Sequence, residues 1–339
     1  MSITVAPVGN SRILSVGTYR PKRVVPNSEI VDRIDSTDEW IVQRTGIESR
    51  RFAGDDETVI SMAKAACEIA LKRAKLTIAD IDTVILSTIS YPFQAPSAAT
   101  ELINELGNPK AAAFDISAAC AGFCYGVAMG SDLVRSGTSK NVLVIGVEKL
   151  SDYTDPDDRA TAFIFADGAG AVVIGQSDQP RIGQTIWGSD ADSRDAITLT
   201  PSFLDFKKNP DKGVTELGWP NISQQGQVVF RWAVYSMSKV GLQALEAAGV
   251  SVDELGAFIP HQANVRIIET MAKEMKIPDS VVIADDIRTN GNTSAASIPL
   301  AMDRILEEHP ELHGKLALLI GYGAGLVYAG QVVELPPKP

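Results

Sequence analysis

The chain has 339 residues, of which 45% are hydrophobic and 22% are charged, a composition typical of globular proteins. This composition excludes a disordered or low-complexity chain, and the length suits one large domain or two fused halves. The formal net charge is −11. Because proteins that bind nucleic acid normally carry a basic surplus, we expect no nucleic acid partner.

The N-terminal segment and the cysteines indicate the cellular setting. The first residues lack the charged start and apolar run of a secretory signal, and no stretch reaches the roughly 18 consecutive apolar residues of a membrane helix. Cys67, Cys120 and Cys124 are too few for a disulfide framework, which indicates a reducing compartment or thiols kept for chemistry. We therefore expect a cytoplasmic protein without membrane contact.

Short apolar runs alternate with helical patterns along the chain. Residues 57–76 carry apolar side chains at three- and four-residue steps and predict an amphipathic helix, and the β-branched run at residues 83–87 predicts a buried strand. Further strands are predicted at residues 141–146, 257–260, 281–284 and 316–320, and further helices at residues 121–134, 229–247 and 264–275. This alternation predicts an α/β architecture with largely parallel strands.

Two short patterns recur about half the chain length apart. Asp167-Gly-Ala-Gly170 resembles Tyr322-Gly-Ala-Gly325, and Ser117-Ala-Ala-Cys120 resembles Ser294-Ala-Ala-Ser297. Two similar halves that face each other explain both, with chance among small residues as the alternative. We place the halves at residues 1–178 and 179–339. Residues 176–227 are rich in Asp, Asn, Pro and Gly, and predict one strand followed by a long covering loop.

Cys120 is the first candidate for chemistry. It follows an apolar strand and precedes a helix, so we expect its thiol in the first turn of that helix, where unpaired N–H groups and the helix dipole favour the thiolate. Small neighbours leave room for a substrate carbonyl, which makes Cys120 a candidate nucleophile; a buried structural cysteine is the alternative. Cys124, one turn deeper, and Cys67 are expected to pack in the core.

His261 and Asn292 occupy comparable junctions. His261 directly follows a predicted strand, at the end where α/β sheets place their sites, although a core histidine is the alternative. Asn292 lies in Gly291-Asn-Thr-Ser294, which also suits an ordinary turn and helix N-cap. Together, a thiolate can take an acyl group from a thioester. The imidazole and the amide can then donate hydrogen bonds to a second thioester as carbon dioxide leaves.

Six segments carry a resemblance to a known family: Ser36-Thr-Asp-Glu-Trp-Ile-Val-Gln-Arg-Thr-Gly-Ile47, Ala119-Cys-Ala-Gly-Phe123, Phe165-Ala-Asp-Gly-Ala-Gly170, Pro260-His-Gln-Ala-Asn264, Gly291-Asn-Thr-Ser-Ala-Ala-Ser297 and Gly321-Tyr-Gly-Ala-Gly325. Over nearly its full length the chain resembles β-ketoacyl-acyl carrier protein synthase III, with an actinobacterial character. The resemblance implies a thiolase-like fold of two similar halves in α/β/α/β/α layers, and a homodimer.

The resemblance also implies the reaction. An acyl-CoA primer acylates Cys120, and malonyl-acyl carrier protein then loses carbon dioxide and condenses with it. The product is a 3-oxoacyl-acyl carrier protein, which initiates type II fatty acid synthesis. By the same resemblance, His261 and Asn292 stabilise the decarboxylation, and the backbone N–H groups of Cys120 and Ala324 form the oxyanion hole. It implies no metal and no cofactor, because the CoA thioester is a substrate.

Binding residues are implied in the same way. Trp40 and Arg159 resemble the residues that sandwich the adenine of CoA, an arrangement that suits an indole and a guanidinium plane. The further residues implied around the CoA and pantetheine moieties are Ser36, Arg44, Gln227, Phe230 and Asn264.

Two more expectations concern the carrier protein and the primer. Because the chain and its substrates are all anionic, a local basic patch must attract the carrier protein; the candidates are Arg231, Arg266, Lys273 and Lys276. Ala95 resembles the position that closes the acyl pocket across the dimer interface. Since some family members carry a bulky Phe there, Ala95 predicts tolerance of branched or longer primers.

Several other readings stay open at this point. A thiolase of the same fold needs a second cysteine near the C-terminus, and none follows Cys124. A relative that makes hydroxymethylglutaryl-CoA or a starter unit of secondary metabolism is the second alternative. A papain-type hydrolase has the same Cys–His–Asn chain order but a different cysteine neighbourhood. A non-catalytic scaffold does not explain why all three polar residues are present.

Overall fold

Two five-stranded sheets form the frame of the molecule within residues 8–339, the part of the chain that the computed structural model describes. The first sheet has the strand order β1-β7-β6-β4-β5. Its strands are β1 (Asn10–Tyr19), β4 (Thr83–Ser87), β5 (Ala112–Ile116), β6 (Asn141–Lys149) and β7 (Asp167–Ser177). The strands β5, β4 and β6 run parallel, and β7 and β1 are added antiparallel.

The second sheet repeats this arrangement with the strand order β8-β14-β13-β11-β12. Its strands are β8 (Ile186–Ser189), β11 (Leu255–Pro260), β12 (Val282–Ile283), β13 (Leu316–Gly323) and β14 (Val327–Glu334). The strands β12, β11 and β13 are parallel, and β14 and β8 are antiparallel, as in the first sheet. The fold is therefore built from two similar halves, and the boundary that we proposed at residue 178 falls between β7 and β8.

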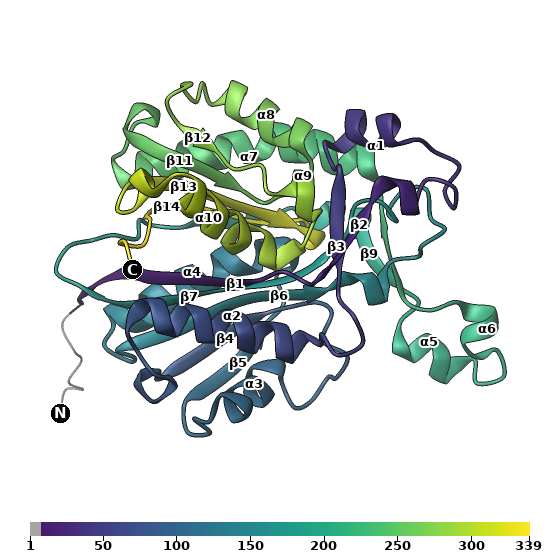
Figure 1. The fold of residues 1–339 in the computed structure, drawn as a ribbon, viewed down its shortest axis with the longest axis horizontal. Coiled ribbons are helices and arrows are strands. Elements are labelled where there is room, and N and C mark those ends of the chain that lie inside the picture. Colours follow the sequence, from purple (N-terminus) through teal and green to yellow (C-terminus); the bar gives the residue numbers. More distant parts are fainter. Residues whose placement is uncertain (1–7) are drawn as a thin grey trace.

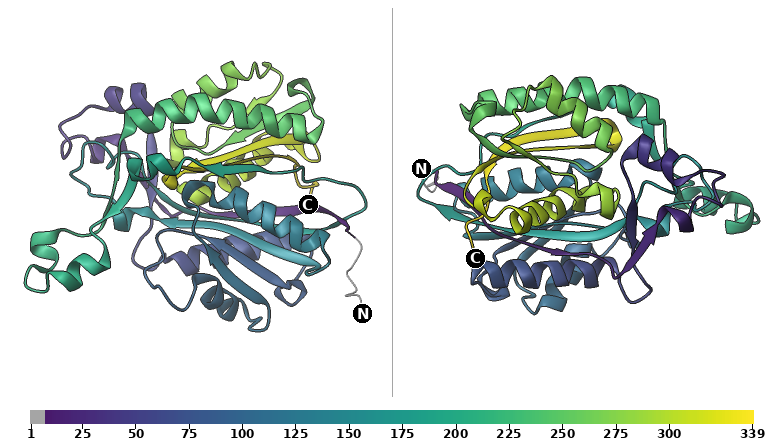
Figure 2. Two further views of the ribbon diagram at one scale, coloured as in Figure 1. Left: turned by 180° about the vertical axis from the view of Figure 1, so that it is seen from behind. Right: turned by 45° about the horizontal axis from the view of Figure 1, so that its top comes forward.

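Helices occupy three layers around these sheets (Figure 1, Figure 2). Helices α4 (Gly122–Arg135) and α10 (Ser297–Glu308) lie between the two sheets and pack against both. The outer helices are α2 (Val59–Ala74) and α3 (Ala98–Leu106) on the first sheet, and α7 (Gly226–Ala248) and α8 (Val265–Glu274) on the second. This confirms the predicted α/β/α/β/α layering.

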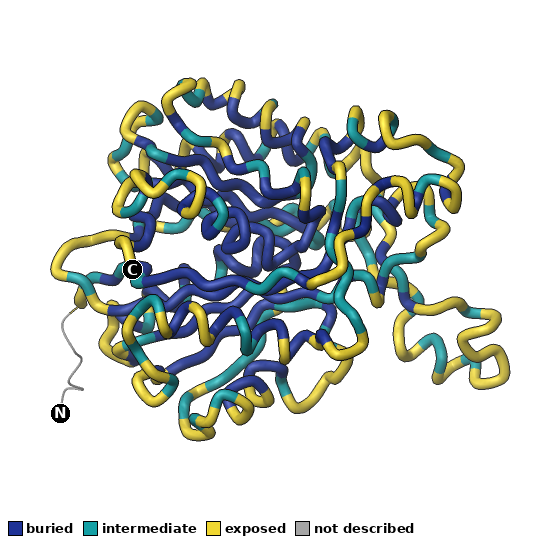
Figure 3. Tube along the Cα trace, in the orientation of Figure 1, coloured by how far each residue is buried: buried dark blue, intermediate teal, exposed yellow. Residues whose placement is uncertain are grey.

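The central layer is the most deeply buried part of the molecule (Figure 3). Most positions of α4 and α10 are buried, as expected for helices that contact a sheet on each side. Small residues make this close packing possible, and Gly146 on β6 is an example: a Cβ atom there would collide with the backbone carbonyl of Ala295. This contact holds the turn that precedes α10 directly against β6, and the turns that precede α4 and α10 also contact each other.

Two excursions extend from one end of the sheets (Figure 1). The first contains the paired strands β2 (Arg23–Pro26) and β3 (Ser49–Phe52), with α1 (Asp38–Thr45) between them; α9 (Ile287–Asn290) packs on β3. The second contains the antiparallel pair β9 (Ile197–Thr200) and β10 (Asn221–Gln224), with α5 (Phe203–Lys208) and α6 (Gly213–Leu217) between them.

The second excursion corrects the prediction for residues 176–227, which contain three strands and two helices rather than one strand and a long loop. The polar residues that indicated a loop are partly helix caps. Ser202 and Asp205 form a capping box at the start of α5, in which the Asp205 carboxylate accepts from the Ser202 backbone N–H at 2.8 Å. The short strand β8 carries no clear sequence signal of its own, because it is a four-residue edge strand without a buried apolar run.

Most of the other predicted elements occur with shifted ends. The strand predicted at residues 83–87 is β4 with the same ends, whereas the strand predicted at residues 281–284 is reduced to the two residues of β12. The helices predicted at residues 57–76, 121–134, 229–247 and 264–275 are α2, α4, α7 and α8. None of the helices within residues 8–339 combines the length and apolar character needed to cross a bilayer.

The internal repeat has a different register from the one the sequence pattern indicated. Ala119 and Ser294 have φ values of 45° and 47° and each begins a 3₁₀ turn, η3 (Ala119–Ala121) or η7 (Ser294–Ala296), that leads into α4 or α10. Ser294 thus corresponds to Ala119 rather than to Ser117. The two glycine-rich segments also lie in different structures. Residues 167–170 are part of β7, whereas residues 322–325 span the end of β13 and the turn after it.

Candidate active site

Cys120 lies in the 3₁₀ turn η3, one turn earlier than the predicted position inside the helix, because α4 begins only at Gly122. The turn is held by the left-handed conformation of Ala119, φ 45°. Opposite it, Gly323 approaches so closely that a Cβ atom there would lie 2.7 Å from the Cys120 backbone nitrogen and 3.2 Å from Sγ. A side chain at position 323 would therefore crowd the thiol.

Burial determines the resting state of the thiol. Burial raises the pKa of Cys120 to about 12; the Ser294 hydroxyl lowers this pKa and the nearby charge of Glu148 raises it, both by less than burial does. The expectation that the helix terminus would favour the thiolate is therefore wrong for the resting enzyme, because the desolvation penalty outweighs the dipole. A proton must leave the sulfur during the reaction itself.

His261 follows β11, as predicted, and its ring is buried beside Tyr322. Its Nδ1 lies 2.7 Å from Ser297 Oγ, and the same oxygen accepts from the Gln262 backbone N–H at 3.3 Å. Burial lowers the pKa of His261 to about 3, so the ring is neutral at pH 7. We infer that the Ser297 hydroxyl, whose oxygen accepts from Gln262, donates its proton to Nδ1, which leaves Nε2–H as the donor of the ring.

We expect Ser297→Ala to slow condensation about fivefold while leaving acylation of Cys120 unchanged. The variant loses the hydrogen bond that fixes the histidine tautomer, and such a bond contributes about 1 kcal/mol. Single-turnover condensation by pre-acylated enzyme measures this effect. Ser297→Thr keeps the hydroxyl and serves as the matched control; equal rates for the alanine variant and the wild type would contradict the assigned tautomer.

Asn292 also lies in the candidate site, but it does not follow a strand as predicted. It follows α9 and Gly291, and its backbone forms a parallel bridge with Phe165. The side-chain oxygen accepts from the Ser294 backbone N–H at 2.9 Å. Because the oxygen is held in this way, the amide nitrogen of Asn292 is the atom available to donate a hydrogen bond to a ligand.

One buried cavity of about 50 Å³ is lined by Cys120, His261 and Asn292 together. Tyr322 and Ala324, at the end of β13 and in the turn η9 (Ala324–Leu326), complete one wall. The excursion β9–β10 covers the cavity from outside with two apolar side chains, Ile197 and Ile222. A thiol, a neutral imidazole donor and an amide donor thus share a nearly dry space, in which hydrogen bonds to a developing negative charge are strong.

A larger cavity of about 900 Å³ joins this site to the surface. Its lining and that of the buried cavity share Gln224, Val229, Ala263 and Asn292. Trp40 lies at the outer part with the guanidinium carbons of Arg44 and Arg159 at 4.5 and 5.4 Å from its ring centroid. The other sequence-predicted residues that line this cavity are Gln227, Phe230, Arg231, Asn264 and Arg266.

Four sequence-predicted residues lie outside both cavities. Ser36 is partly buried, and its hydroxyl has no hydrogen-bond partner within residues 8–339. Lys273 lies on α8 together with Arg266, whereas Lys276 follows the end of that helix, and both are exposed. Ala95 is exposed in the segment between β4 and α3. Within one chain, therefore, Ala95 does not contact the thiol cavity.

Sequence reasoning missed the residues that support the candidate site. Ser297 is the last residue of the motif at residues 291–297, but the sequence does not show that the fold places its hydroxyl next to His261. Glu148 lies near the end of β6, a buried apolar strand. A single acidic residue in an apolar strand is the sequence signal that could have identified it. Ser294 lines the buried cavity with a hydroxyl that makes no hydrogen bond within the described chain.

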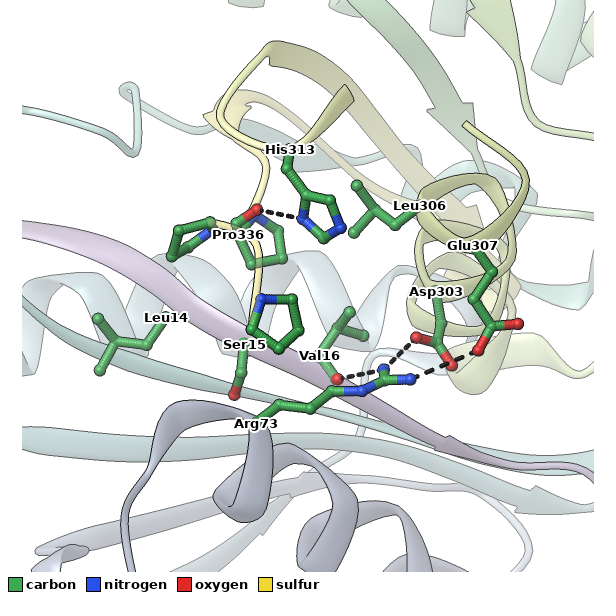
Figure 4. Close-up of a pocket in the computed structure, with 11 residues that line it drawn as sticks. Leu14, Ser15, Val16, Arg73, Asp303, Leu306, Glu307, His313 and Pro336 are labelled. Atoms are coloured by element: carbon green, nitrogen blue, oxygen red, sulfur yellow. Dashed lines mark hydrogen bonds and ion pairs between the residues drawn. The ribbon is translucent and has the colours of Figure 1, made fainter. Parts of the chain in front are cut away.

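A separate cavity of about 140 Å³ lies at the seam between the two halves, near the C-terminus (Figure 4). Its only arginine, Arg73, is already paired with Asp303 and with Glu307, and it donates to the Val16 carbonyl at 2.8 Å. The Nδ1 atom of His313 lies 2.9 Å from the Pro336 carbonyl oxygen. This cavity shares no lining residue with the candidate site.

Comparison with known proteins agrees with this geometry. Residues 114–191 match the family model of 3-oxoacyl-[acyl-carrier-protein] synthase III, and residues 245–335 match the model of its C-terminal part. The beta-ketoacyl-[acyl-carrier-protein] synthase III 1 of Streptomyces coelicolor is 54% identical over 331 residues, which cover 96% of each chain.

Solved structures give the same result. The priming beta-ketosynthase of the R1128 polyketide biosynthetic pathway superposes with a TM-score of 0.96 at 43% identity and full coverage of both chains. The 3-oxoacyl-[acyl-carrier-protein] synthase III of Aquifex aeolicus has a TM-score of 0.87 at 36% identity, covering 96% of this chain and 100% of its own. The chain belongs to the 3-oxoacyl-[acyl-carrier-protein] synthase III family.

Proposed function

We propose that the chain condenses an acyl-CoA primer with malonyl-acyl carrier protein, giving a 3-oxoacyl-acyl carrier protein and carbon dioxide, and so initiates type II fatty acid synthesis. One observation carries this proposal: the Cys120 thiol shares a single buried cavity with the His261 imidazole and the Asn292 amide. The family of the chain supports it, because the names of its relatives describe this synthase activity.

In the first stage, Sγ of Cys120 attacks the carbonyl carbon of the acyl-CoA. The S–C bond to the enzyme forms, the S–C bond to CoA breaks, and the thiol proton ends on the CoA sulfur. The tetrahedral oxygen carries negative charge, and the backbone N–H groups of Cys120 and Ala324 are the donors that we assign to it. Gly323 keeps the space beside Sγ open for the acyl group.

In the second stage, malonyl-acyl carrier protein enters the same cavity and loses carbon dioxide. The electrons of the broken C–C bond move onto the thioester carbonyl as an enolate. His261 Nε2–H and the Asn292 amide donate to that oxygen, and because both donors are buried they act at low dielectric. The enolate carbon then attacks the acyl group on Cys120, and the thiolate leaves.

Steady-state product analysis tests the proposal directly. Purified enzyme is incubated with malonyl-acyl carrier protein and one acyl-CoA at a time, from acetyl-CoA to branched and longer primers. We expect 3-oxoacyl-acyl carrier protein in the mass spectrum of the carrier protein, with one carbon dioxide released per product. Absence of product with every primer would contradict the proposed function.

Trp40 is proposed to stack on the adenine of CoA. We expect Trp40→Ala to raise KM for acyl-CoA roughly tenfold with little change in kcat, because stacking of a base on an aromatic ring contributes about 1–3 kcal/mol. Initial rates at varied acyl-CoA concentration measure both constants. Trp187→Ala removes an exposed indole that lines neither cavity and should change neither constant; a kcat effect without a KM effect at Trp40 would contradict stacking.

Arg266 is proposed to attract the carrier protein, supported by its exposed position on the rim of the large cavity. We expect Arg266→Glu to raise KM for malonyl-acyl carrier protein roughly tenfold, since rim charges act mainly on association, while acylation by acyl-CoA is spared. Lys72→Glu on α2, at the opposite face of the molecule, makes the same charge change and serves as the control. Equal loss in both stages would contradict a carrier-protein role.

A homodimer is also proposed. The strand β5 lies at the edge of the first sheet, so its outer backbone groups can pair with a second copy across a twofold axis. The segment before α3 supports this, because Phe93 is 62% exposed and Ala95 lies beside it without contacting its own chain's cavity. In such a dimer Ala95 would close the partner's acyl pocket. A cytoplasmic location stays a prediction.

A second function is favoured by one comparison. The priming ketosynthase of a polyketide pathway matches the whole chain with a TM-score of 0.96. The same chemistry would then make a starter unit of secondary metabolism rather than a fatty acid. Comparing kcat/KM with carrier proteins of the fatty acid type and of the polyketide type separates the two, because only the preferred carrier protein differs between them.

A further inference from the structure

A buried carboxyl group lies next to the candidate nucleophile without lining the substrate cavity. Glu148, near the end of β6, is completely buried. Its Oε2 accepts hydrogen bonds from Ser90 Oγ at 2.6 Å, from Thr88 Oγ1 at 3.1 Å and from the Ile89 backbone N–H at 3.1 Å. Its Oε1 accepts only from the same Ile89 N–H, at 3.3 Å. One carboxyl oxygen is thus left with spare capacity for a proton.

The Ser294 hydroxyl is close to both this carboxyl group and the thiol. It lines the buried cavity with Cys120, is itself 1% exposed, and makes no hydrogen bond within residues 8–339. It lowers the pKa of both the Cys120 thiol and the Glu148 carboxyl, as a hydroxyl close to both groups does. An unpartnered buried hydroxyl is costly, which points to a use in the reaction cycle.

The backbone holds Ser294 in this place. Its left-handed conformation, φ 47°, and the bond from its N–H to Asn292 Oδ1 fix the start of η7. Gly146 lies two residues before Glu148 on the same face of β6 and allows η7 to pack directly on the strand. The arrangement is therefore built into the fold and does not depend on a mobile side chain.

Acylation needs a group that can hold the thiol proton, and His261 is unsuited to this. Burial lowers the pKa of His261 to about 3, and its Nε2 already carries a proton because Ser297 occupies Nδ1. Burial raises the pKa of Glu148 to about 7, and its hydrogen bonds from Ser90, Ile89 and Thr88 moderate that rise. A base that titrates near the working pH is the more efficient one.

The groups that face Glu148 do not neutralise it. From η3 it faces the Cys120 thiol, and from η4 (Leu150–Tyr153) the Tyr153 phenol. No lysine or arginine within residues 8–339 forms an ion pair with it, and the ammonium group of the adjacent Lys149 donates instead to the Gly54 carbonyl at 3.1 Å. Asp167 on β7 is engaged by Ser151 and the Ala53 N–H. The Glu148 carboxylate is thus free to take a proton.

We propose that Glu148, acting through the Ser294 hydroxyl, holds the proton of Cys120 while the thiol is acylated. This rests on the proposed acyl transfer to Cys120. As the bond from Sγ to the acyl carbon forms, the Sγ proton passes to Ser294 Oγ, whose own proton passes to Glu148 Oε1. When the bond between the acyl carbon and CoA breaks, the CoA sulfur takes the proton back along the same path. Glu148 acts through Ser294 and is therefore a positioning residue.

The experiment measures the single-turnover rate at which acetyl-CoA acylates the enzyme, by rapid quenching and intact-protein mass spectrometry, over a range of pH. We expect the wild-type rate to rise with pH through the titration of Glu148, since only the carboxylate accepts a proton. Glu148→Gln should acylate roughly 100-fold more slowly and lose that rise. Ser294→Ala, which removes only the unpartnered hydroxyl, should behave in the same way and replaces Glu148→Gln if that variant does not fold.

A control variant and the direction of the rate change distinguish a proton-holding role of Glu148 from a structural or purely electrostatic role. Ser87→Ala removes another buried hydroxyl that has no hydrogen-bond partner within residues 8–339; it lies against Gly122 but outside the cavity, and its loss should change the rate less than about twofold. Because the Glu148 charge raises the pKa of Cys120, a purely electrostatic role would make Glu148→Gln faster. An equal or faster rate overturns the proposal, as does a slower rate that keeps the wild-type pH profile. A wild-type enzyme that takes no acyl group overturns the proposed function itself.

Discussion

Cys120→Ala is expected to take no acyl group from any acyl-CoA and to lose condensation by about 10⁴-fold or more, as when the nucleophile of a cooperating catalytic set is removed. The physical reason is that no other thiol can replace it. Cys124 lies one turn deeper in α4 and Cys67 is inside α2, and both are fully buried away from the cavity. Intact-protein mass spectrometry and single-turnover condensation measure the two losses.

Cys124→Ala is the matched control for this prediction. Its sulfur packs against Gly321, so the substitution removes a buried atom at a similar depth and in the same helix. We expect a modest loss of stability and an unchanged acyl adduct, since that sulfur does not line the cavity. An acyl group retained by Cys120→Ala, or lost in Cys124→Ala, would move the nucleophile elsewhere.

Asn292→Asp is expected to slow condensation about 10²- to 10³-fold while Cys120 is still acylated. The carboxylate keeps the acceptor that binds the Ser294 N–H, so the turn is preserved, but the donor to the enolate oxygen is gone. Loss of one such donor costs about 2.7–4 kcal/mol of barrier. Decarboxylation of malonyl-acyl carrier protein by pre-acylated enzyme isolates the affected stage.

Comparing the effects of Asn292→Asp on acylation and on condensation shows which role the side chain has. Equal slowing of acylation and condensation would assign Asn292 to the shape of the cavity and not to the enolate. His261→Ala should show the same split, because its Nε2–H is proposed to donate to the same oxygen. The two losses should not add, since each donor acts within one unit.

The sequence predicts the parallel centre of each sheet well. The runs at β4, β6, β11 and β13 are continuously buried between helices, and such strands are recognisable from their apolar character alone. The outer antiparallel strands are harder to predict, and β8, with four residues, is too short to carry a clear pattern. Residues 197–224 mix strand, cap and helix signals within a few residues, so local propensity favours a loop there.

The candidate site also contains residues that the sequence predicts and residues that it does not. Cys120 and His261 follow the strands β5 and β11, so a rule about strand ends is sufficient to find them. The motif around Asn292 locates this residue, but the predicted strand before it is wrong, because α9 precedes it. Ser297 and Glu148 escape prediction because their partners are distant in the sequence. Ser297 lies 36 residues from His261, and Glu148 lies 58 and 60 residues from Ser90 and Thr88.

Burial also explains why charge states were harder to predict than positions. A helix terminus lowers the pKa of a thiol, but no sequence rule gives the depth at which the thiol lies. In this fold the cavity is closed by β9–β10 and by the end of β13, and desolvation becomes the largest influence on Cys120 and on His261. Both groups are thereby kept neutral until substrate enters.

The most direct test of the central claim locates the acyl group. The enzyme is treated with acetyl-CoA, digested, and fragmented so that Cys120 is distinguished from Cys124. We expect the acetyl group on Cys120 alone, and its complete loss, with formation of a 3-oxoacyl-acyl carrier protein, once malonyl-acyl carrier protein is added. An acetyl group on another residue, or one that persists on Cys120 after that addition, would contradict the account.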